Sequence, residues 1–345
     1  MELYDDFDNL EDLPRIKNMP EYRPPQPWRG RSKKQKKLSQ TDILASLNEQ
    51  SDEAGDYSFT YDASRHEREW IVNSLGLFYE MQWFSDVLRL VKGGKEASVY
   101  QCIASSNSPV DGKSIAAKVY RPRRFRNLRK DYIYREGRAE LDASGNAIID
   151  DGMLKAIRQR SDYGRQVMHN SWLEHEFKTM QLLYTAGADV PKPYTSGNNA
   201  ILMEFIGDAE IAAPTLNTVD LDRVEASILF ERTIFNVEIM LANERVHADL
   251  SAFNILYWEG EITMIDFPQA ISPLENQNAF PIFERDLRRI CEYFIRQGVI
   301  VDYQELARKL WQTNKYRQMP EIDISLLDGE DEQDRVYWDQ FKNDL

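Results

Sequence analysis

Two cysteines, Cys102 and Cys291, are all that this chain of 345 residues contains. So few cysteines predict neither a disulfide framework nor a cysteine-based metal site, and they suit a reducing compartment such as the cytoplasm. No apolar run approaches the roughly 18 residues of a membrane-spanning helix. The first residues lack the cationic start and apolar stretch of a signal peptide. We therefore expect a cytoplasmic protein without membrane association.

An excess of positive charge is also absent, since 57 acidic residues against 43 basic ones give a formal net charge of −14. This charge argues against a protein that coats nucleic acid along its whole length. The exception is the segment 28–37, which carries six basic residues within a polar, proline-containing region, 1–62, that we expect to be disordered. The segment is either a solvated tail or an arm that contacts RNA phosphates or an acidic partner. At the other end, 319–345 is predicted to be a loose acidic tail.

Three polar residues are concentrated around a predicted hairpin. Asp249 precedes Asn254 by five residues, and Asp266 follows Asn254 by twelve. Apolar runs at 255–257 and 262–265 flank Glu259-Gly260-Glu261, which predicts two strands joined by a tight turn. The hairpin would bring the three side chains together. Hard oxygen ligands beside a free carboxylate suit Mg²⁺ bound to substrate phosphates, and protein kinases use this D-x-x-x-x-N spacing.

A glycine loop lies earlier in the chain, between two apolar runs at 87–91 and 97–102. Gly93 and Gly94 would let backbone N–H groups approach phosphate oxygens, but a plain hairpin explains them equally well. The segment is not a Walker A loop, which requires a different glycine spacing. The next strand contains Lys118 among apolar residues, where a lysine is costly unless it is paired. Glu176 is the candidate partner, and Glu174 is a less favoured neighbour.

Helical periodicity predicts helices at 63–85, 220–243, 283–298 and 302–312. Between Lys118 and Glu176 lies a long insertion, 121–170, that opens with a basic run. A loop of this length without structure is either functional or disordered, so it could be a solvated flap or a basic surface beside the site.

These stretches together resemble the RIO family of atypical serine/threonine protein kinases over roughly residues 64–312. The most specific segment is His247-Ala248-Asp249-Leu250-Ser251-Ala252-Phe253-Asn254. The others are Gly94–Tyr100, Lys118–Tyr120, Trp172 with Glu174 and Glu176–Phe177, Met203 with Phe205 to Gly207, Ala212–Pro214, and Ile265–Asp266 with Gln269. The order of parts is closer to the branch without an N-terminal winged-helix domain.

The resemblance implies an α+β fold with two lobes, a small β-rich N-lobe (63–206) and a mainly helical C-lobe (207–318). It implies ATP and Mg²⁺ as cofactors and the following roles. Asp249 would be the catalytic base, and Asn254 and Asp266 the metal ligands, with Asp266 also a phosphate acceptor in ATP hydrolysis. Lys118, paired with Glu176, would bind phosphates. The remaining nucleotide contacts would be Gly94, Lys95, Glu96 and Ser98 in the glycine loop and Met203, Glu204 and Ile206 around the adenine.

The implied partners are a protein substrate or the chain itself, and the small ribosomal subunit or its rRNA. Two places depart from the family pattern: Lys92-Gly93 stands where a hydroxyl pair is common, and Phe267-Pro268-Gln269 replaces Val-Ser-Gln. Neither an A-P-E motif nor a long activation segment follows Asp266, so ATPase-driven assembly switching is an alternative. Two further functions fit the same residues, a small-molecule kinase of the aminoglycoside-phosphotransferase type and a nucleotide-binding pseudokinase scaffold. The sequence does not indicate an oligomeric state.

Overall fold

The computed structural model describes most of the chain between Ser58 and Tyr316. The described ranges are 58–94, 96–110, 112–121, 138–142, 145–159 and 161–316. The basic segment 28–37, Lys95 and the acidic tail 319–345 lie outside them, as does almost all of the predicted extension 1–62. In the described part, no helix has the length and apolar character needed to cross a membrane.

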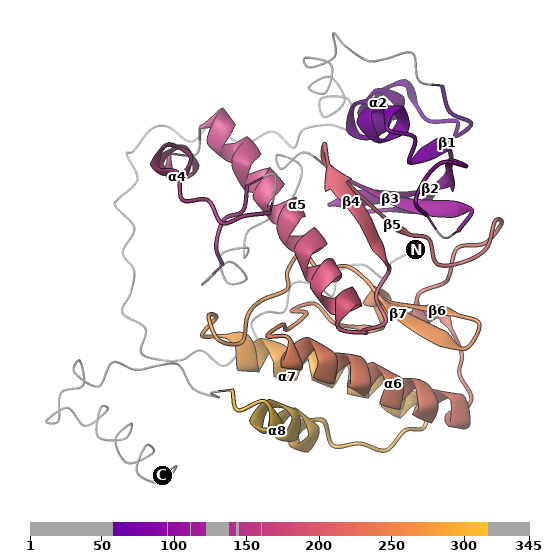
Figure 1. Cartoon of the computed structure of the whole chain (residues 1–345). Helices are drawn as coiled ribbons and strands as arrows, with labels where there is room; N and C mark the ends of the chain where they lie inside the picture. Colours follow the sequence, from indigo (N-terminus) through magenta and orange to yellow (C-terminus); the bar gives the residue numbers. More distant parts are fainter. Residues whose placement is uncertain are drawn as a thin grey trace, which may run out of the picture.

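Five antiparallel strands form the sheet of the N-lobe, in the order β1-β2-β3-β5-β4 (Figure 1). They are β1 (Phe84–Gly93), β2 (Ala97–Ala104), β3 (Ser114–Tyr120), β4 (Pro193–Gly197) and β5 (Ala200–Glu204). β3 lies at the centre, and each of its residues after Ser114 is buried. Because side chains alternate along a strand, Lys118 shares one face with Ala116 and Tyr120, and Ala117 faces the other way. The sheet thus has two distinct buried faces.

One face of the sheet is covered by α2 (Arg65–Glu80), where Leu75 and Phe78 pack with Tyr100 and Ala117 in one apolar core (Figure 1). Ser64 caps the start of α2 by accepting a hydrogen bond from the backbone N–H of Glu67. The predicted helix 63–85 is too long at its C-terminal end. Gln82 has a φ of 59°, which an α-helix does not accommodate, and β1 begins directly afterwards.

The other face of the sheet meets α5 (Asp162–Thr185), which runs from the sheet down to the C-lobe (Figure 1). Leu173 and Phe177, in its middle, cluster with Tyr120 and Ile201 of the sheet. The insertion 121–170 is therefore not structureless where it is described, since α4 (Asp151–Arg158) and the first turns of α5 occupy its second half. Two helix caps explain this, because Asp150 and Ser161 each accept a backbone N–H of the following helix.

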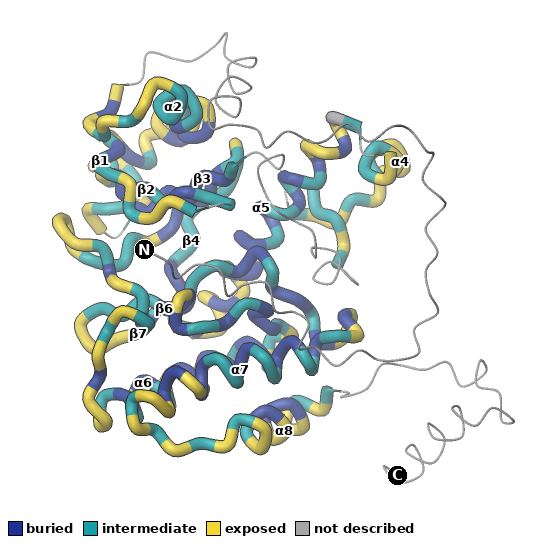
Figure 2. The backbone as a smooth tube through the Cα atoms, turned by 180° about the vertical axis from the view of Figure 1, so that it is seen from behind, coloured by how far each residue is buried: buried dark blue, intermediate teal, exposed yellow. Residues whose placement is uncertain are grey.

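The C-lobe consists of stacked helices and one hairpin. Its elements are α6 (Arg223–Ala242), α7 (Ala279–Arg296) and α8 (Tyr303–Thr313), with β6 (Ile255–Trp258), β7 (Glu261–Met264) and short 3-10 turns at Leu216–Thr218 and Ala252–Asn254. Buried positions recur along α6 and α7, and exposed residues occupy other faces (Figure 2). The two-lobed α+β architecture and the three predicted C-lobe helices are confirmed, although α7 begins four residues before its predicted start at Phe283.

The predicted hairpin forms as β6 and β7, which pair in antiparallel register with Trp258 opposite Glu261. Glu259 and Gly260 make the turn, with φ values of 50° and 87°. Two successive residues with positive φ are typical of a type I′ turn, which matches the twist of the strands it joins. The hairpin fixes the distance between the two loops at its base, where Ile265 donates a backbone hydrogen bond of 3.0 Å to Asn254.

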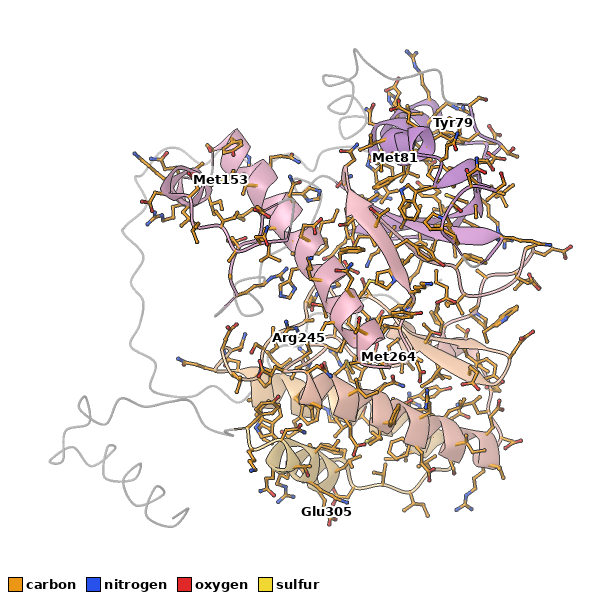
Figure 3. The ribbon with its side chains drawn as sticks, in the orientation of Figure 1. Tyr79, Met81, Met153, Arg245, Met264 and Glu305 are labelled. Atoms are coloured by element: carbon orange, nitrogen blue, oxygen red, sulfur yellow. The ribbon has the colours of Figure 1, made fainter. Side chains whose placement is uncertain are left out.

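The junction of α5 with the hairpin joins the two lobes. The backbone N–H of Met264 donates to the Asp189 carbonyl at 2.7 Å, and Figure 3 shows Met264 below the C-terminal end of α5. The Asp189 carboxylate in turn accepts from Arg232 and from the fully buried Asn236, both of α6. This network places the end of α5 against both the hairpin and α6.

Candidate active site

Lys118 is the centre of the polar contacts between the lobes. Its Nζ lies 2.7 Å from Glu176 Oε1 on α5 and 2.5 Å from Asp266 Oδ1, which follows β7. The structure thus brings together Lys118 and the glutamate that the sequence favoured, while Glu174 accepts a hydrogen bond from Ser196 instead. Burial alone would lower the pKa of Lys118, but the two carboxylates outweigh it and raise that pKa. Lys118 is therefore charged.

Tyr120 holds the same glutamate from the other side. Its hydroxyl donates to Glu176 Oε2, so both carboxylate oxygens of this almost fully buried side chain have donors. The Tyr120 ring packs edge-on against Trp172, one of the aromatic residues on α5. Sequence reasoning did not assign Tyr120 a role. Its position two residues after Lys118 is a usable signal, because alternation places both side chains on one face.

Asp266 has a left-handed backbone, with a φ of 75°. A residue other than glycine adopts this conformation only when its surroundings hold it there. Burial would raise the pKa of its carboxyl, but the Lys118 ammonium at 2.5 Å more than offsets this, and the pKa is lowered. The group is therefore an ionised carboxylate. Within the described residues Oδ2 has no bonded partner and is available to a cation.

Asn254 is oriented by its amide nitrogen. Nδ2 donates to the Asp249 backbone carbonyl at 2.9 Å and to Asp249 Oδ2 at 3.2 Å. This orientation leaves the amide oxygen, Oδ1, without a donor among the described residues. With the Asp266 carboxylate across the hairpin, it forms a hard oxygen set of the kind that Mg²⁺ accepts. The described part contains no group of three His, Cys, Asp or Glu residues that could hold a metal by themselves, so substrate oxygens would have to complete the coordination.

His247 connects the loop that carries Asp249 to the residue before Asp266. Its buried Nδ1 accepts the backbone N–H of Asp249 at 3.3 Å, so Nε2 carries the proton and donates to the Ile265 carbonyl at 3.1 Å. Its ring packs 4.8 Å from that of Phe267. The imidazole thus bridges the segment of the candidate base to the segment of the candidate metal ligand. This is a structural role, as expected for a lone histidine.

Asp249 lies where the loop approaches α7. Burial raises the pKa of its carboxyl, and the Asp286 and Asp266 carboxylates add to this, whereas the Arg289 guanidinium acts in the opposite direction. A raised pKa brings a carboxylate closer to the range in which it can accept a proton from a hydroxyl. This electrostatic environment is compatible with the predicted role of Asp249 as a general base.

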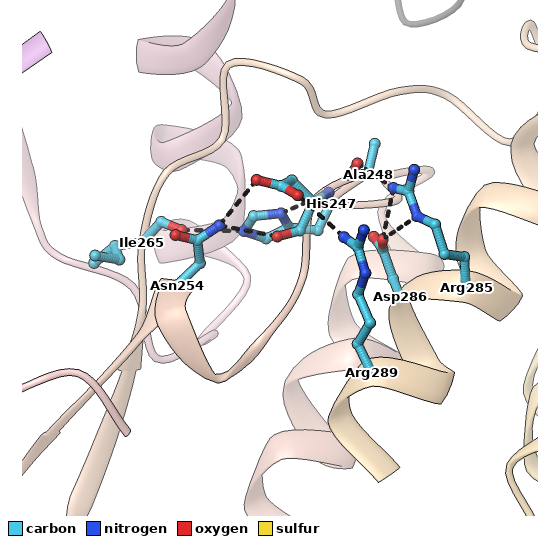
Figure 4. Close-up of polar contacts among 8 residues, drawn as sticks. His247, Ala248, Asn254, Ile265, Arg285, Asp286 and Arg289 are labelled. Carbon is cyan, nitrogen blue, oxygen red and sulfur yellow. Dashed lines mark hydrogen bonds and ion pairs between the residues drawn. The ribbon is translucent and has the colours of Figure 1, made fainter. Parts of the chain in front are cut away.

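Two arginines of α7 that sequence reasoning did not select contact this loop, and Asp286 pairs with one of them (Figure 4). Arg289 Nη1 donates to Asp249 Oδ1 at 3.2 Å. Arg285 donates to the Ala248 carbonyl at 2.5 Å and to Asp286 Oδ1 at 2.8 Å. Ala248 itself has a φ of 67°, so Arg285 supports a backbone conformation that alanine rarely adopts. The sequence did contain one indication of these contacts, because Asp286 is a charged residue at a position of α7 that the helical period assigns to the core.

The glycine loop is described only in part, because Lys95 lies outside the described residues. Gly94 donates its N–H to the Ala97 carbonyl, which closes the turn between β1 and β2, and the Glu96 carbonyl accepts from Arg121 after β3. The nucleotide contact of Ser98 stays a prediction, and the strand register places only its side chain. Ser98 pairs with Val119 in the β2–β3 register, so it shares the α2-covered face and points away from Lys118.

The predicted adenine contacts lie at the end of β5. Met203 is buried and pairs with Ala116, so it shares the face of Lys118. The Glu204 side chain is exposed and its backbone N–H donates to the Lys192 carbonyl. The Ile206 carbonyl accepts from Ala213, and in the described part of the chain its N–H has no acceptor. A donor of this kind suits the edge of a base.

A family model described as the RIO domain matches residues 98–306, which is more than half of the chain. The chain belongs to the RIO family. The RIO-type serine/threonine-protein kinase Rio1 of Haloferax volcanii is 29% identical over 221 residues, covering 63% of this chain and 66% of that protein. Human serine/threonine-protein kinase RIO1 is 29% identical over 212 residues, covering 61% of this chain and 34% of that protein. The match thus spans less than two thirds of either relative.

Two solved structures of the Rio2 kinase from Chaetomium thermophilum are also similar. The ADP/Mg²⁺-phosphoaspartate complex has 21% sequence identity and a TM-score of 0.47, and covers 70% of this chain and 66% of that chain. The second structure has 20% identity and a TM-score of 0.46, and covers 72% of this chain and 69% of that chain.

Proposed function

We propose that this protein is an ATP- and Mg²⁺-dependent serine/threonine protein kinase of the RIO type. The observation that carries the proposal is the convergence of five polar side chains at the base of one hairpin. Lys118 is bonded to Glu176 and Asp266 on one side, and Asp249 is bonded to Asn254 on the other. Cation, metal-ligand oxygens and candidate base are the parts that phosphoryl transfer requires.

Each residue has a distinct task in this proposal. Lys118 binds phosphate oxygens, and Glu176 holds its ammonium in place. Asn254 and Asp266 supply oxygen ligands for Mg²⁺, which when bound neutralises phosphate charge. Asp249 accepts the proton of the attacking hydroxyl. Since the groups are held by the fold before substrate arrives, most of the catalysis comes from positioning and electrostatics.

ATP hydrolysis through a phosphorylated Asp266 is the second candidate. It is favoured by the ionised Asp266 carboxylate, whose Oδ2 has no partner in the described part of the chain. Nucleophilic attack by this oxygen on the γ-phosphorus would break the bond to the ADP oxygen and form an acyl phosphate. Water would then release inorganic phosphate.

One experiment separates the two candidates. The full chain is incubated with γ-labelled ATP and Mg²⁺, and the labelled protein is treated with hydroxylamine. Serine kinase activity predicts label on a serine or threonine that resists hydroxylamine. Label that hydroxylamine removes supports the phosphoenzyme. Absence of both protein label and phosphate release would contradict both candidates and favour the pseudokinase scaffold.

The small ribosomal subunit, or its rRNA, is the proposed partner, and cytoplasmic location is part of the same proposal. Both rest on the family resemblance. Addition of purified small subunits should change the rate of ATP hydrolysis, and ribosomal RNA alone should do so if the RNA is the contact. An unchanged rate with intact subunits would contradict the proposed partner and leave the enzyme activity standing.

A further inference from the structure

Arg289 donates a hydrogen bond to one carboxylate oxygen of Asp249, the candidate base. Its Nη1 lies 3.2 Å from Asp249 Oδ1, while Asp249 Oδ2 accepts from Asn254. Both carboxylate oxygens thus have donors in this structure (Figure 4). A base must take a hydroxyl proton within about 2.6–3.2 Å, and a charged donor on the same oxygen makes that oxygen a poorer acceptor. Efficient proton transfer would therefore benefit from moving Arg289 to another anion.

The guanidinium of Arg289 can accept such an exchange. Its side chain is 34% exposed, and within the described residues its only polar partner is Asp249. A guanidinium has five donors in a planar fork that fits a carboxylate or phosphate in bidentate geometry. Four of these donors remain available to a substrate group.

Arg285, one turn earlier on α7, differs in this respect. Its side chain is only 11% exposed, and its Nη2 donates to both the Ala248 carbonyl and Asp286. Arg285 is thus committed to holding the loop. Arg288 has a third environment, because its ion-pair partner is Glu292 on the same helix, at 3.8 Å, rather than a residue of the loop. Of these three arginines, Arg289 is the one placed to bind substrate.

The position of Arg289 also limits where the substrate anion can be. The acceptor hydroxyl must reach Asp249, and the guanidinium is in direct contact with that carboxylate. Consecutive residues of an extended peptide are separated by about 3.3–3.6 Å. An anionic side chain bound to Arg289 would therefore stand one or two residues from the phosphoacceptor.

We infer that Arg289 is a specificity residue that recognises an anionic side chain one or two positions from the phosphoacceptor serine or threonine. Binding of that side chain draws Arg289 from Asp249 and frees the base for the hydroxyl. This inference rests on the proposed kinase function and adds its substrate class. Carboxylates and phosphorylated side chains offer the same chemistry to the fork.

The test uses the full chain and a serine peptide library with one variable position at a time. At each flanking position the library contains Glu, Gln or phosphoserine, and kcat/KM is measured for each. The native enzyme should favour an anion over Gln by about tenfold at a position one or two residues from the serine. The Glu and phosphoserine peptides distinguish the two sources of charge.

The matched variants are Arg289→Gln and Arg288→Gln, which remove one positive charge from neighbouring positions. Arg289→Gln should abolish the preference and leave measurable activity on the Gln peptides, whereas Arg288→Gln should retain the preference. Equal loss on all peptides, or an unchanged preference in Arg289→Gln, would overturn the inference. A native enzyme that phosphorylates all peptides equally also overturns it, with the kinase function intact. ATP hydrolysis without any peptide or protein labelling would instead contradict the kinase function itself, and the inference with it.

Discussion

Lys118 on β3 and Asp266 after β7 come from different lobes, and their side chains lie 2.5 Å apart. Glu176 completes the cluster from α5, so three elements distant in sequence converge on a single ammonium group. The cluster links sheet, helix and hairpin. Its loss should therefore affect both the fold and nucleotide binding.

Replacing the cation tests this dual role. Lys118→Met leaves the buried Glu176 carboxylate with the Tyr120 hydroxyl but without its ammonium partner, and breaking a buried ion pair costs about 3–5 kcal/mol. We expect the free energy of unfolding in urea to fall by about that amount and nucleotide affinity to be lost. Lys309→Met, on the exposed face of α8, removes the same charge and should change neither. Equal stability of the two variants would contradict a structural role for the cluster.

The candidate base is tested by an isosteric change. Asp249→Asn keeps the shape of the side chain but cannot accept a proton, so turnover should fall by roughly 10²–10⁴-fold. Nucleotide affinity, measured by calorimetry, should remain within a few-fold of native because Asp249 is not a proposed metal ligand. A variant that transfers phosphate at the native rate would exclude Asp249 as the base.

Metal dependence should reside in Asp266. Removal of Mg²⁺ with a chelator should weaken ADP binding to the native chain, since Asp266 would hold a metal that neutralises the phosphates when bound. Asp266→Asn should bind ADP with an affinity that Mg²⁺ no longer improves. Asp302→Asn is the control, because Asp302 caps α8 and asparagine is an equally good cap. A normal Mg²⁺ effect in Asp266→Asn would disprove the assignment.

Two glycines should respond in opposite ways to alanine. Gly207 has a φ of 133°, and a Cβ there would lie 2.4 Å from the Ile211 carbonyl oxygen. Gly207→Ala should thus lower the free energy of unfolding by about 1–3 kcal/mol and disturb the segment that follows β5. Gly76 lies inside α2 with open space around it, so Gly76→Ala should stabilise by about 0.5–1 kcal/mol. Thermal unfolding of both variants gives the comparison.

His175 should make the fold sensitive to acid. Burial, together with the nearby Arg138 and Arg245, lowers its pKa from 6.5 to about 2. Between these values the unfolded chain takes up a proton that the folded chain does not. Stability from this group is therefore present above pH 6.5 and decreases by up to about 1.4 kcal/mol per unit as the pH falls.

His175→Gln should remove this pH-dependent contribution to the free energy of unfolding. The variant should unfold at a lower pH than the native chain in an acid titration followed by circular dichroism. Identical acid midpoints would show that His175 is not buried in its neutral form.

Local patterns allowed much of the site to be predicted. The spacing of Asp249, Asn254 and Asp266 around a short turn determines their proximity, because a tight hairpin permits only one arrangement. Lys118 required a partner for energetic reasons, and α5 supplied Glu176. Ser98 was assigned to the glycine loop from the family resemblance, and strand alternation places its side chain on the face opposite Lys118.

The contacts of α7 could not be predicted in the same way. Arg285 and Arg289 are charged residues on an amphipathic helix, and their spacing to the catalytic loop depends on tertiary packing alone. Most charged residues on such helices are merely solvated. The second half of the insertion was missed because its helices are defined by the caps Asp150 and Ser161, and the long span of polar sequence obscured them.

α5 carries Glu176, and its apolar residues are divided between two cores. Leu173 and Phe177 pack against the sheet, whereas Met180 and Leu183 belong to the core of the C-lobe. Many protein kinases switch off by moving the corresponding helix and breaking its ion pair with the lysine. Such a swing here would expose apolar surface in both lobes at once. We therefore expect α5 to stay in place when nucleotide binds or leaves, and regulation by rotation of this helix to be energetically unfavourable.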